Sequence, residues 1–419
     1  MMRILVIGQG GREHAIAWKL AKSKRAEAIF VAPGNGGTSH EEKCVNIDID
    51  VLDFEAIKQF ILDHSVSLVV VGPEDPLVQG IKDYLIGCDV MVFGPDSVAA
   101  QLEGSKIYSK EFMFENNIPT GEAKFFSEAR LAKEYLDKIN FPIVLKADGL
   151  AAGKGVLVTE NRQEALDWID DVMENSKFGD AGQKILIEEC LYGTELSFMG
   201  IMTPDCFIPF ETSIDYKPLL DGNKGPNTGG MGCMSPSPFM NDELKSYIVK
   251  EVVNPTIDGL RKRGINYYGF MYFGLMVKDN KPKVLEYNCR LGDPETQCLM
   301  MQMESDFLEI LLSCLEDKKP NIEWNTGASM GVVIASGGYP NAYQKGEKIT
   351  LGDVGDCKLF HAGTQSLNNE LVTSGGRVFS LNYQSKTIDD CKKYIYEKIS
   401  SVDFSNCIHR TDIGDIYES

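Results

Sequence analysis

The first hundred residues alternate short β-branched segments with amphipathic ones, and this alternation limits the possible folds more than any other feature. Within residues 54–64, for example, Phe54, Ile57 and Ile61 recur at the spacing of one helix face. Strands that alternate with helices predict an α/β protein with a small, doubly wound parallel sheet in this region. The expected strands are Arg3–Ile7, Ala28–Ala32, Leu68–Val71 and Val90–Phe93.

Polar turns follow three of these strands, at the carboxyl ends where doubly wound sheets bind ligands. The first turn, Gly8–His14, is close to a dinucleotide fingerprint, but Glu13 stands where the third glycine belongs. Free N–H groups at the start of a helix still attract anions, so we expect this turn to hold a phosphate of a substrate. A merely tight turn is an equally good alternative. The other two turns are Pro33–Asn35 and Gly72–Asp75.

Lysines stand at the ends of expected elements in the next region. Ser105 can cap a helix that begins at Lys106, and Lys146 ends the strand expected at Pro142–Lys146. A flexible Gly/Ala loop, residues 147–155, then leads to another strand and can fold over phosphates. It is not a Walker A loop, because Lys154 is not followed by Ser or Thr and no helix follows.

The strand expected at Val284–Cys289 carries two hard oxygen ligands on one face. Successive strand side chains point to opposite faces, so Glu286 and Asn288 lie side by side, with Arg290 just beyond. Such ligands suit Mg²⁺ or Mn²⁺ that takes its other ligands from water and phosphates, and an arginine alongside can pair with a phosphate. The alternative is an ordinary strand with solvated polar residues, which the pattern alone favours. The metal site becomes the better interpretation only when the other motifs are considered with it.

Acidic residues and a long loop complete the candidate site. The strand expected at Lys184–Leu191 ends in acids, and the following backbone can pair an adenine edge. Glu195 can accept hydrogen bonds from ribose hydroxyls, although such residues are usually ordinary surface acids. The Gly/Pro/Asn-rich segment from Asp215 to Gly232 is long enough to be either functional or disordered, and its composition favours an ordered, functional loop.

From about Ala328 onward, strands dominate the pattern. Arg377 is the most interesting cation of this section, although a solvated arginine is the simpler alternative. The expected elements are the strands Met330–Ala335, Lys358–His361 and Arg377–Leu381 and a helix over Ile388–Ile399.

Composition excludes several classes of protein. The formal net charge of −19 argues against broad nucleic-acid binding, so any phosphate site must be built locally. No run approaches the ~20 apolar residues of a membrane helix. The 11 cysteines contain no Cys-x-x-Cys pair, which argues against zinc and a disulfide framework and for reduced cytoplasmic thiols.

These motifs together resemble the ATP-grasp superfamily and, more narrowly, the phosphoribosylamine–glycine ligase family of purine biosynthesis. The motifs are long, specific and spread over essentially the whole chain. They are Gly8–His14, Gly72–Glu74, Gln101–Lys106, Lys146–Gly155, Gly225–Gly232, Glu286–Gln297 and His361–Thr364.

The resemblance implies an ATP-grasp fold and a reaction. ATP, glycine and 5-phospho-β-D-ribosylamine would give glycinamide ribonucleotide, ADP and phosphate. The glycine carboxylate would attack the γ-phosphoryl group to form glycyl phosphate, and the ribosylamine nitrogen would then attack the activated carbonyl. No enzyme nucleophile is required, which fits the absence of a Ser-His or Cys-His signature.

The resemblance also implies residue roles. The metal, Mg²⁺ or Mn²⁺, would be held by Glu286 and Asn288; many relatives carry a further glutamate on the preceding strand, where Gly274 stands here. ATP contacts would come from Lys106, Lys146, Gly149, Gly153, Lys154, Gly155, Glu188, Leu191 and Glu195, with Glu188 and Leu191 at the adenine. Substrate contacts would come from Gly10, Gly11, Arg12, Glu74, Asp215, Lys217, Asn227, Thr228, Arg290, Asp293 and Arg377. The expected catalytic residues are Arg290, Asp293 and Lys154.

We expect three domains: a substrate-binding α/β domain (1–103), an ATP-grasp domain (104–327, with its lid-bearing subdomain at about 122–193) and a small strand-rich domain (328–419). The expected partners are small molecules, with neither nucleic acid nor membrane among them. We expect the protein to be a monomer or weak dimer and to be located in the cytoplasm. Another ATP-grasp ligase or a bicarbonate-using carboxylase is the first alternative. A nucleotide-binding regulatory protein or a dinucleotide oxidoreductase is less favoured.

Overall fold

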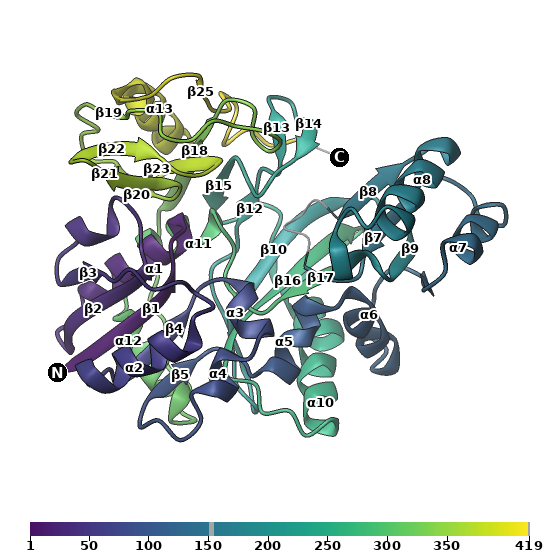
Figure 1. Ribbon diagram of the computed structural model, residues 1–419, viewed down its shortest axis with the longest axis horizontal. Coiled ribbons are helices and arrows are strands. Elements are labelled where there is room, and N and C mark those ends of the chain that lie inside the picture. The colour runs from purple at the N-terminus through teal and green to yellow at the C-terminus, as the bar shows by residue number, and fades with distance from the viewer. Residues whose placement is uncertain (151–154, 418–419) are drawn as a thin grey trace.

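A parallel sheet in the order β3-β2-β1-β4-β5 forms the N-terminal part of the molecule (Figure 1). The structure is a computed structural model and describes residues 1–150 and 155–417. Both faces of β1 are buried in separate cores, with Leu5 and Ile7 in one and Ile4 and Val6 in the other. The predicted doubly wound sheet is therefore confirmed. Its elements are β1 (Met2–Gly8), α1 (Gly11–Ala21), β2 (Ala26–Pro33), β3 (Cys44–Asn46), α2 (Phe54–His64), β4 (Leu68–Val71), α3 (Glu74–Val78), α4 (Ile81–Tyr84), β5 (Met91–Phe93) and α5 (Ser97–Gly104).

An antiparallel sheet in the order β11-β10-β16-β17 forms the centre of the molecule. Phe198 of β10 packs in the core that also holds Ile248 and Leu260, whereas its neighbour Met199 packs in the core with Leu299 and Phe307. Helices therefore cover both faces of this sheet. The elements are α6 (Lys106–Glu115), β10 (Thr194–Met202), β11 (Phe207–Pro209), α9 (Asp242–Ile248), α10 (Asn254–Lys262), β16 (Gly269–Lys278), β17 (Lys281–Asn288), α11 (Glu295–Gln302) and α12 (Phe307–Leu315).

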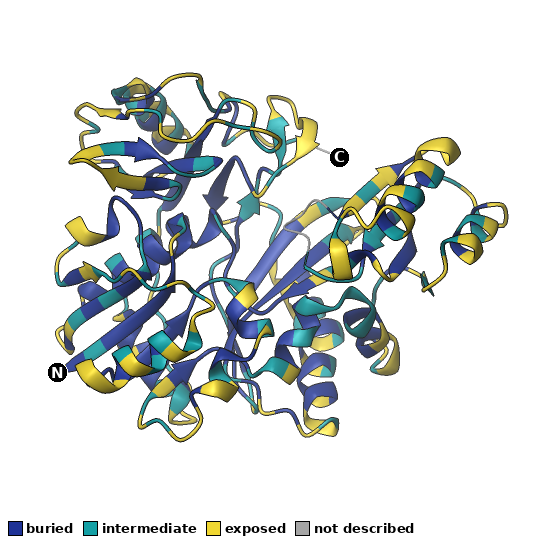
Figure 2. Ribbon diagram, in the orientation of Figure 1, coloured by how far each residue is buried: buried dark blue, intermediate teal, exposed yellow. Residues whose placement is uncertain are grey.

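A smaller antiparallel sheet, in the order β6-β9-β7-β8, has its own core and projects from the body with α7 and α8 (Figure 1). The outer surfaces of these helices are largely exposed (Figure 2). This lobe faces the central sheet, because Lys146 of β7 donates a hydrogen bond to Leu285 O of β17 at 3.3 Å. Its elements are β6 (Ala123–Phe126), α7 (Ala129–Leu136), β7 (Ile143–Ala147), β8 (Val156–Thr159), α8 (Arg162–Ile169) and β9 (Ile185–Glu189).

The last large sheet, in the order β12-β15-β18-β23-β20, joins the C-terminal residues to an earlier part of the chain. Two of its strands, β12 and β15, lie within residues 214–235, and β15 pairs with β18. The predicted strand-rich C-terminal region is confirmed. Its sheet also contains β12 and β15, which precede residue 328, the predicted start of the C-terminal domain. The elements are β12 (Ile214–Asp215), β13 (Pro218–Leu220), β14 (Lys224–Asn227), β15 (Gly232–Ser235), β18 (Ala328–Ser336), β19 (Thr350–Leu351), β20 (Lys358–His361), β21 (Thr364–Leu367), β22 (Glu370–Thr373), β23 (Arg377–Ser385), α13 (Ile388–Lys398), β24 (Val402–Asp403) and β25 (Cys407–Ile408).

Within the two described ranges, 1–150 and 155–417, no helix combines the length and the apolarity required to cross a bilayer.

Candidate active site

The first part of the site is a pair of lysines that lie where the small lobe meets the central sheet. The predicted cap is confirmed, because the Ser105 side chain accepts a hydrogen bond from Tyr108 N at 3.0 Å. Asp148, in the turn after β7, accepts hydrogen bonds from Ser105 Oγ at 2.9 Å and Ile107 N at 2.8 Å. Lys106 Nζ donates to Gly149 O at 3.0 Å. The start of α6 is thereby fixed to the end of β7, which carries Lys146.

Glu286 lies opposite these lysines on β17, where the sequence predicted a metal ligand. Its register partner across the sheet is Gly274 of β16. Desolvation by the surrounding protein favours the neutral acid, but the charges of Lys217, Lys146, Lys106 and Arg290 outweigh it and lower the pKa of the Glu286 carboxyl. Solvent nevertheless reaches the residue, and no described side chain hydrogen-bonds its carboxylate. Glu286 is therefore an ionised, accessible ligand in a positively charged setting.

Asn288 is buried two positions further along β17, on the same side of the strand. The described residues contain no group of three or more His, Cys, Asp or Glu side chains that could enclose a metal. A carboxylate and an amide alone fit a cation such as Mg²⁺, which retains water and shares phosphate oxygens with its substrate. They do not fit a fully protein-enclosed structural ion.

Glu188, the predicted adenine contact, is buried between two lysines at the end of β9. Its Oε2 lies 3.0 Å from Lys146 Nζ, and its Oε1 lies 3.4 Å from Lys110 Nζ. Burial lowers the pKa of the Lys110 ammonium to about 8, although the negative charge of Glu188 opposes the shift. Lys110 was not anticipated from the sequence. Leu191 is half-buried just beyond β9.

Glu195, the predicted ribose contact, lies at the start of β10. Its Oε2 is 3.0 Å from Lys217 Nζ. This ion pair joins the central sheet to the segment 215–232, which the structure shows to be ordered, as predicted, through the hairpin of β13 and β14. Thr228 donates a hydrogen bond to Lys217 O at 2.7 Å, whereas Asn227 lies exposed on the hairpin.

Arg290 follows β17 and is held by two carboxylates. Its Nε lies 3.1 Å from Glu103 Oε1 and 3.3 Å from Glu74 Oε2. Glu103 is buried and also accepts a hydrogen bond from Cys289 N at 2.6 Å. Burial raises the pKa of Glu103 to about 7, although Arg290 opposes the shift. The sequence indicated Glu74 and Arg290 but not Glu103, whose position inside the motif Gln101–Lys106 was the available signal.

The glycine-rich first turn already contains an anion, supplied by the chain itself. Glu13 Oε2 accepts a hydrogen bond from Gly10 N at 2.7 Å, and Oε1 accepts one from Arg12 Nε at 2.5 Å. A side chain at Gly72 would overlap the Glu13 carboxylate, with an ideal Cβ 2.1 Å from Oε1. Glu13 thus blocks the approach that a dinucleotide would need. A substrate phosphate would have to displace the Glu13 carboxylate before it could use the N–H of Gly10.

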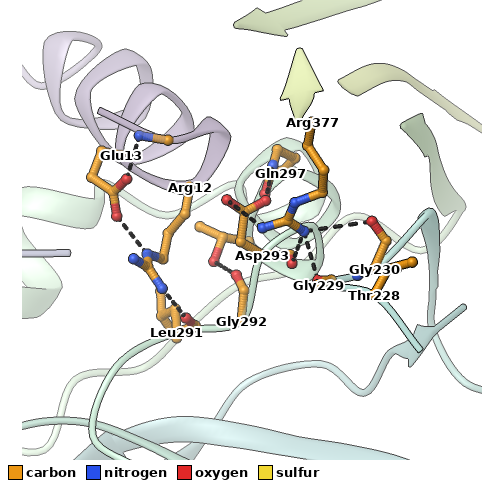
Figure 3. Close-up of polar contacts among 12 residues, drawn as sticks. Arg12, Glu13, Thr228, Gly229, Gly230, Leu291, Gly292, Asp293, Gln297 and Arg377 are labelled. Carbon is orange, nitrogen blue, oxygen red and sulfur yellow. Dashed lines mark hydrogen bonds and ion pairs between the residues drawn. The ribbon is translucent and has the colours of Figure 1, made fainter. Parts of the chain in front are cut away.

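Asp293 and Arg377 form the centre of a polar cluster that joins three segments (Figure 3). The guanidinium of Arg377 donates to Gly229 O at 2.6 Å, and one of its nitrogens lies 3.4 Å from Asp293 Oδ2. Asp293 Oδ1 accepts from Gln297 Nε2 at 2.8 Å, and Arg12 donates to Leu291 O at 3.1 Å. Both Asp293 and Arg377 therefore have extensive contacts within the protein, and their predicted substrate contacts stay predictions.

Several of the predicted residues thus lie together, and two lie outside the described part of the chain. Lys106, Lys146 and Lys217 surround Glu286, while Arg290 links this region to Glu74. Gly155 directly precedes β8, and Gly153 and Lys154 are not among the described residues. The prediction missed several buried polar residues of this region, among them Glu103, Lys110, Ser197, Tyr272 and Glu295.

Two antiparallel sheets face each other, with Lys106 and Lys146 where they meet and the accessible carboxylate of Glu286 opposite these lysines. Such an arrangement is that of an ATP-grasp enzyme. Residues 2–103, 104–296 and 329–416 match the N domain, the ATP-grasp (A) domain and the C domain of phosphoribosylglycinamide synthetase. The chain belongs to this phosphoribosylglycinamide synthetase family and is an ATP-dependent ligase.

Named relatives match along nearly their whole length. A phosphoribosylamine–glycine ligase of Vibrio parahaemolyticus is 44% identical over 419 residues, covering 99% of this chain and 98% of that protein. One from Escherichia coli K12 is 44% identical over 420 residues, with the same coverage. The crystal structure of phosphoribosylamine–glycine ligase from Thermotoga maritima is 34% identical, has a TM-score of 0.86 and covers 98% of this chain and 100% of that chain.

More distant structures show the fold alone. The biotin carboxylase domain of a Hydrogenobacter thermophilus 2-oxoglutarate carboxylase has a TM-score of 0.73 at 15% identity, covering 97% of this chain and 91% of that chain. Such a likeness carries no substrate from the carboxylases to this protein.

Proposed function

We propose that the described site joins glycine to 5-phospho-β-D-ribosylamine, with cleavage of ATP to ADP and phosphate, in purine biosynthesis. Family membership and full-length similarity to named phosphoribosylamine–glycine ligases support this reaction. The observation that carries it in the structure is the convergence of Lys106, Lys146 and Lys217 on the accessible carboxylate of Glu286. Positive charges beside a carboxylate that can bind a metal suit a site where a triphosphate reacts with a carboxylic acid.

ATP would lie between the small lobe and the central sheet. Lys106 and Lys146 would balance its phosphate charge, and Gly149 and Gly155 border the loop whose other predicted contacts are Gly153 and Lys154. Glu188 and Leu191 would meet the adenine, and Glu195 the ribose hydroxyls. Both acids are ion-paired with lysines in the structure, so ATP would have to share or exchange these partners.

The divalent metal is proposed to be Mg²⁺ or Mn²⁺, held by Glu286 and Asn288. When bound, such an ion neutralises charge on the phosphates during phosphoryl transfer. The lysines around Glu286 keep that carboxylate ionised, so the ligand is ready without loss of a proton.

Phosphoribosylamine would occupy the region between the N-terminal sheet and the turn after β17. The substrate contacts proposed there are Gly10, Gly11, Arg12, Glu74, Arg290, Asp293 and Arg377, with Asp215, Lys217, Asn227 and Thr228 from the central segment. Arg290 is held from two sides by acids, so its guanidinium enters the site in a fixed orientation. Fixed charges of this kind stabilise a developing negative charge without reorganisation. Arg290, Asp293 and Lys154 are the proposed catalytic residues.

We further propose three domains, at residues 1–103, 104–327 and 328–419, in a cytoplasmic enzyme that works as a monomer or weak dimer. The family matches at residues 2–103, 104–296 and 329–416 support the division.

A coupled assay of ADP formation tests the function. With ATP, Mg²⁺ and phosphoribosylamine present, we expect turnover that depends on glycine and falls to background when bicarbonate or D-alanine replaces it. Product analysis should find glycinamide ribonucleotide. Turnover with bicarbonate, or ADP release that does not depend on glycine, would contradict the proposal.

A further inference from the structure

We propose that Lys110 is a positioning residue for ATP binding, because it balances the buried charge of Glu188 when the phosphates of ATP draw Lys146 away from that carboxylate. The inference rests on the proposed function and extends it to a lysine for which the sequence indicated no role. The evidence comes from the contacts of Lys110, from the burial of Glu188 and from the two lysines that share its charge.

Lys110 has an acceptor for each of its three ammonium protons. The residue lies on α6 and is 2% exposed. Its Nζ donates to Thr120 Oγ1 at 2.7 Å and to Gly121 O at 3.3 Å, and Glu188 Oε1 lies 3.4 Å away. The ammonium is therefore fixed within the protein, and we treat it as a stationary charge rather than as a phosphate contact.

The Thr120 contact connects Lys110 to the strand that carries the proposed metal ligands. Thr120 donates its hydroxyl proton to Val284 O at 2.7 Å, and Val284 N donates to Pro119 O at 2.7 Å. Val284 lies two positions before Glu286 on β17. The central sheet thus sets the position of the Lys110 ammonium.

Glu188 belongs to the other side of the junction between the body and the small lobe. Phe112 of α6 packs in the same core as Val284 of β17, whereas Ile187 of β9 packs in the separate core of the lobe. α6 lies beside the lobe where the lobe joins the body (Figure 1). The ion pair of Lys110 and Glu188 therefore links the body to the lobe.

Lys146 is the second cation at Glu188, and it is less enclosed than Lys110. Its Nζ lies 3.0 Å from Glu188 Oε2, and its side chain is 11% exposed. Its hydrogen bond to Leu285 O is 3.3 Å long. Because Lys146 is also a proposed phosphate contact, ATP competes with Glu188 for it.

Glu188 needs a cation that stays when Lys146 moves to the phosphates. The residue is 6% exposed, and its Oε1 has no hydrogen-bond partner among the described residues. A buried charge that loses its partner is strongly unfavourable, because the protein solvates it poorly. With Lys146 on the phosphates, Lys110 is the cation that remains beside Glu188.

The groups around Lys110 leave its ammonium protonated at neutral pH. Burial lowers the pKa of Lys110 to about 8; the charge of Glu188 opposes this shift, that of Lys146 adds to it, and that of Glu189 opposes it. Glu189 itself pairs with Lys283. The ammonium is thus the main form at pH 7 and loses its proton as the pH rises through about 8.

Lys110→Met tests this role, because it removes the charge and keeps an unbranched side chain. We expect the KM for ATP to rise about tenfold to a hundredfold, since ATP binding would then leave Glu188 buried without a cation. The kcat and the KM for glycine should change less than about threefold. Lys262→Met, which alters an exposed lysine on α10, is the matched control and should leave all substrate constants unchanged. A KM for ATP within threefold of the wild-type value in Lys110→Met would show that the inference is wrong.

A double-mutant cycle with Glu188→Gln separates charge compensation from a general structural effect. Glu188→Gln removes the charge that Lys110 balances and keeps a carbonyl oxygen at the same place. We expect Lys110→Met to raise the KM for ATP by less than about threefold when Glu188→Gln is also present, against about tenfold or more when it is not. Equal increases in both backgrounds would mean that Lys110 acts through another group.

Adenosine provides a second comparison, because it has no phosphate that could draw Lys146 from Glu188. We expect the inhibition constant of adenosine against ATP to rise less than about threefold in Lys110→Met, since the pair of Glu188 and Lys146 stays intact. Equal losses of affinity for adenosine and ATP would contradict the coupling to phosphate binding.

The pH dependence of ATP binding gives a test that does not require Lys110→Met to fold. We expect the wild-type dissociation constant for ATP, measured by calorimetry without glycine, to rise as the pH passes about 8, because Lys110 then loses its proton. In Glu188→Gln this rise should be absent. A rise of the same size in both proteins would overturn the inference. If the wild type shows no glycine-dependent turnover, the proposed function fails, whereas the dissociation constants for ATP still decide the role of Lys110.

Discussion

At the level of single residues, the site depends on how a few acids and lysines share charge, and Glu286 is the clearest case. Its carboxylate is accessible and surrounded by positive charge, so it can bind a cation but contributes little packing. We expect Glu286→Ala to reduce kcat by about a thousandfold or more, because electrostatic stabilisation of the transition state usually supplies much of the rate enhancement of phosphoryl transfer. Glycine-dependent ADP formation gives the rate, and circular dichroism the folded state.

The control for Glu286→Ala is Lys281→Ala, which alters an exposed residue at the start of the same strand. It should retain wild-type activity. If Glu286→Ala unfolded the protein, the residue would be structural; if activity survived within tenfold, the metal site would lie elsewhere.

Glu103 gives a prediction about pH. Burial raises its pKa to about 7 in the folded protein, whereas an unfolded glutamate titrates near 4.5. Between these values the folded state binds more protons than the unfolded state, so this residue's contribution to stability is present below pH 4.5 and is lost as the pH rises through 7. Glu103→Gln cannot lose a proton. Its stability relative to the wild type should therefore increase from pH 5 to pH 8, by about 1–3 kcal/mol.

Urea unfolding at the two pH values measures this difference. The exposed pair Lys348–Glu370 provides the control, since Glu370→Gln should change stability equally at both values. A constant difference for Glu103→Gln across the range would show that the carboxyl is already ionised at pH 5.

At the level of helices and strands, local sequence signals were enough to predict an element where a capping residue or a regular apolar spacing was present. The helix Phe54–His64 was predicted to the residue, and Asp53 caps it by accepting from Ala56 N at 3.0 Å. The short strand β3 and the hairpin of β13 and β14 were not predicted. The hairpin contains glycine, proline and exposed residues, so it has none of the apolar alternation that marks a half-buried strand.

That hairpin is held instead by a buried ion pair far along the chain. Arg410 is 1% exposed; its guanidinium donates to both oxygens of Asp412 at 2.7 Å and to Pro218 O at 3.0 Å. Asp412 in turn accepts from Gly222 N at 2.7 Å. Arg410 and Pro218 are 192 residues apart in the sequence, which explains why no local pattern indicated this contact.

We expect Arg410→Met to lower the free energy of unfolding by about 3–5 kcal/mol, because it leaves Asp412 buried without its cation. Chemical denaturation would measure the loss. Arg261→Met removes an exposed pair with Asp205 and should change stability by less than about 1 kcal/mol. Similar small losses in both variants would mean that Asp412 is already hydrated.

At the level of the whole molecule, the C-terminal sheet depends on strands from two distant parts of the chain. The sequence indicated the strands of residues 328–419 but not their partners, because a strand pattern carries no information on which edge it will join. β15 and β12 extend this sheet, and Cys298 of α11 packs against it, with its Sγ 3.5 Å from Cys233 O and 3.7 Å from Asn382 Oδ1. Arg377 adds a polar link from β23 to Asp293 (Figure 3).

This interleaving predicts that the C-terminal region cannot be removed cleanly. A chain ending at residue 327 would leave β15 without its partner β18 and would expose the buried side of α11. Unpaired edges and uncovered apolar faces promote association. We expect the fragment to aggregate or to bind a hydrophobic dye strongly, and to lose ATP-dependent turnover, whereas supplying residues 328–419 as a separate chain should restore part of its solubility. Size-exclusion chromatography with dye binding measures the first effect. A soluble, monomeric fragment with a cooperative thermal transition would show that the central and N-terminal sheets fold without the C-terminal one.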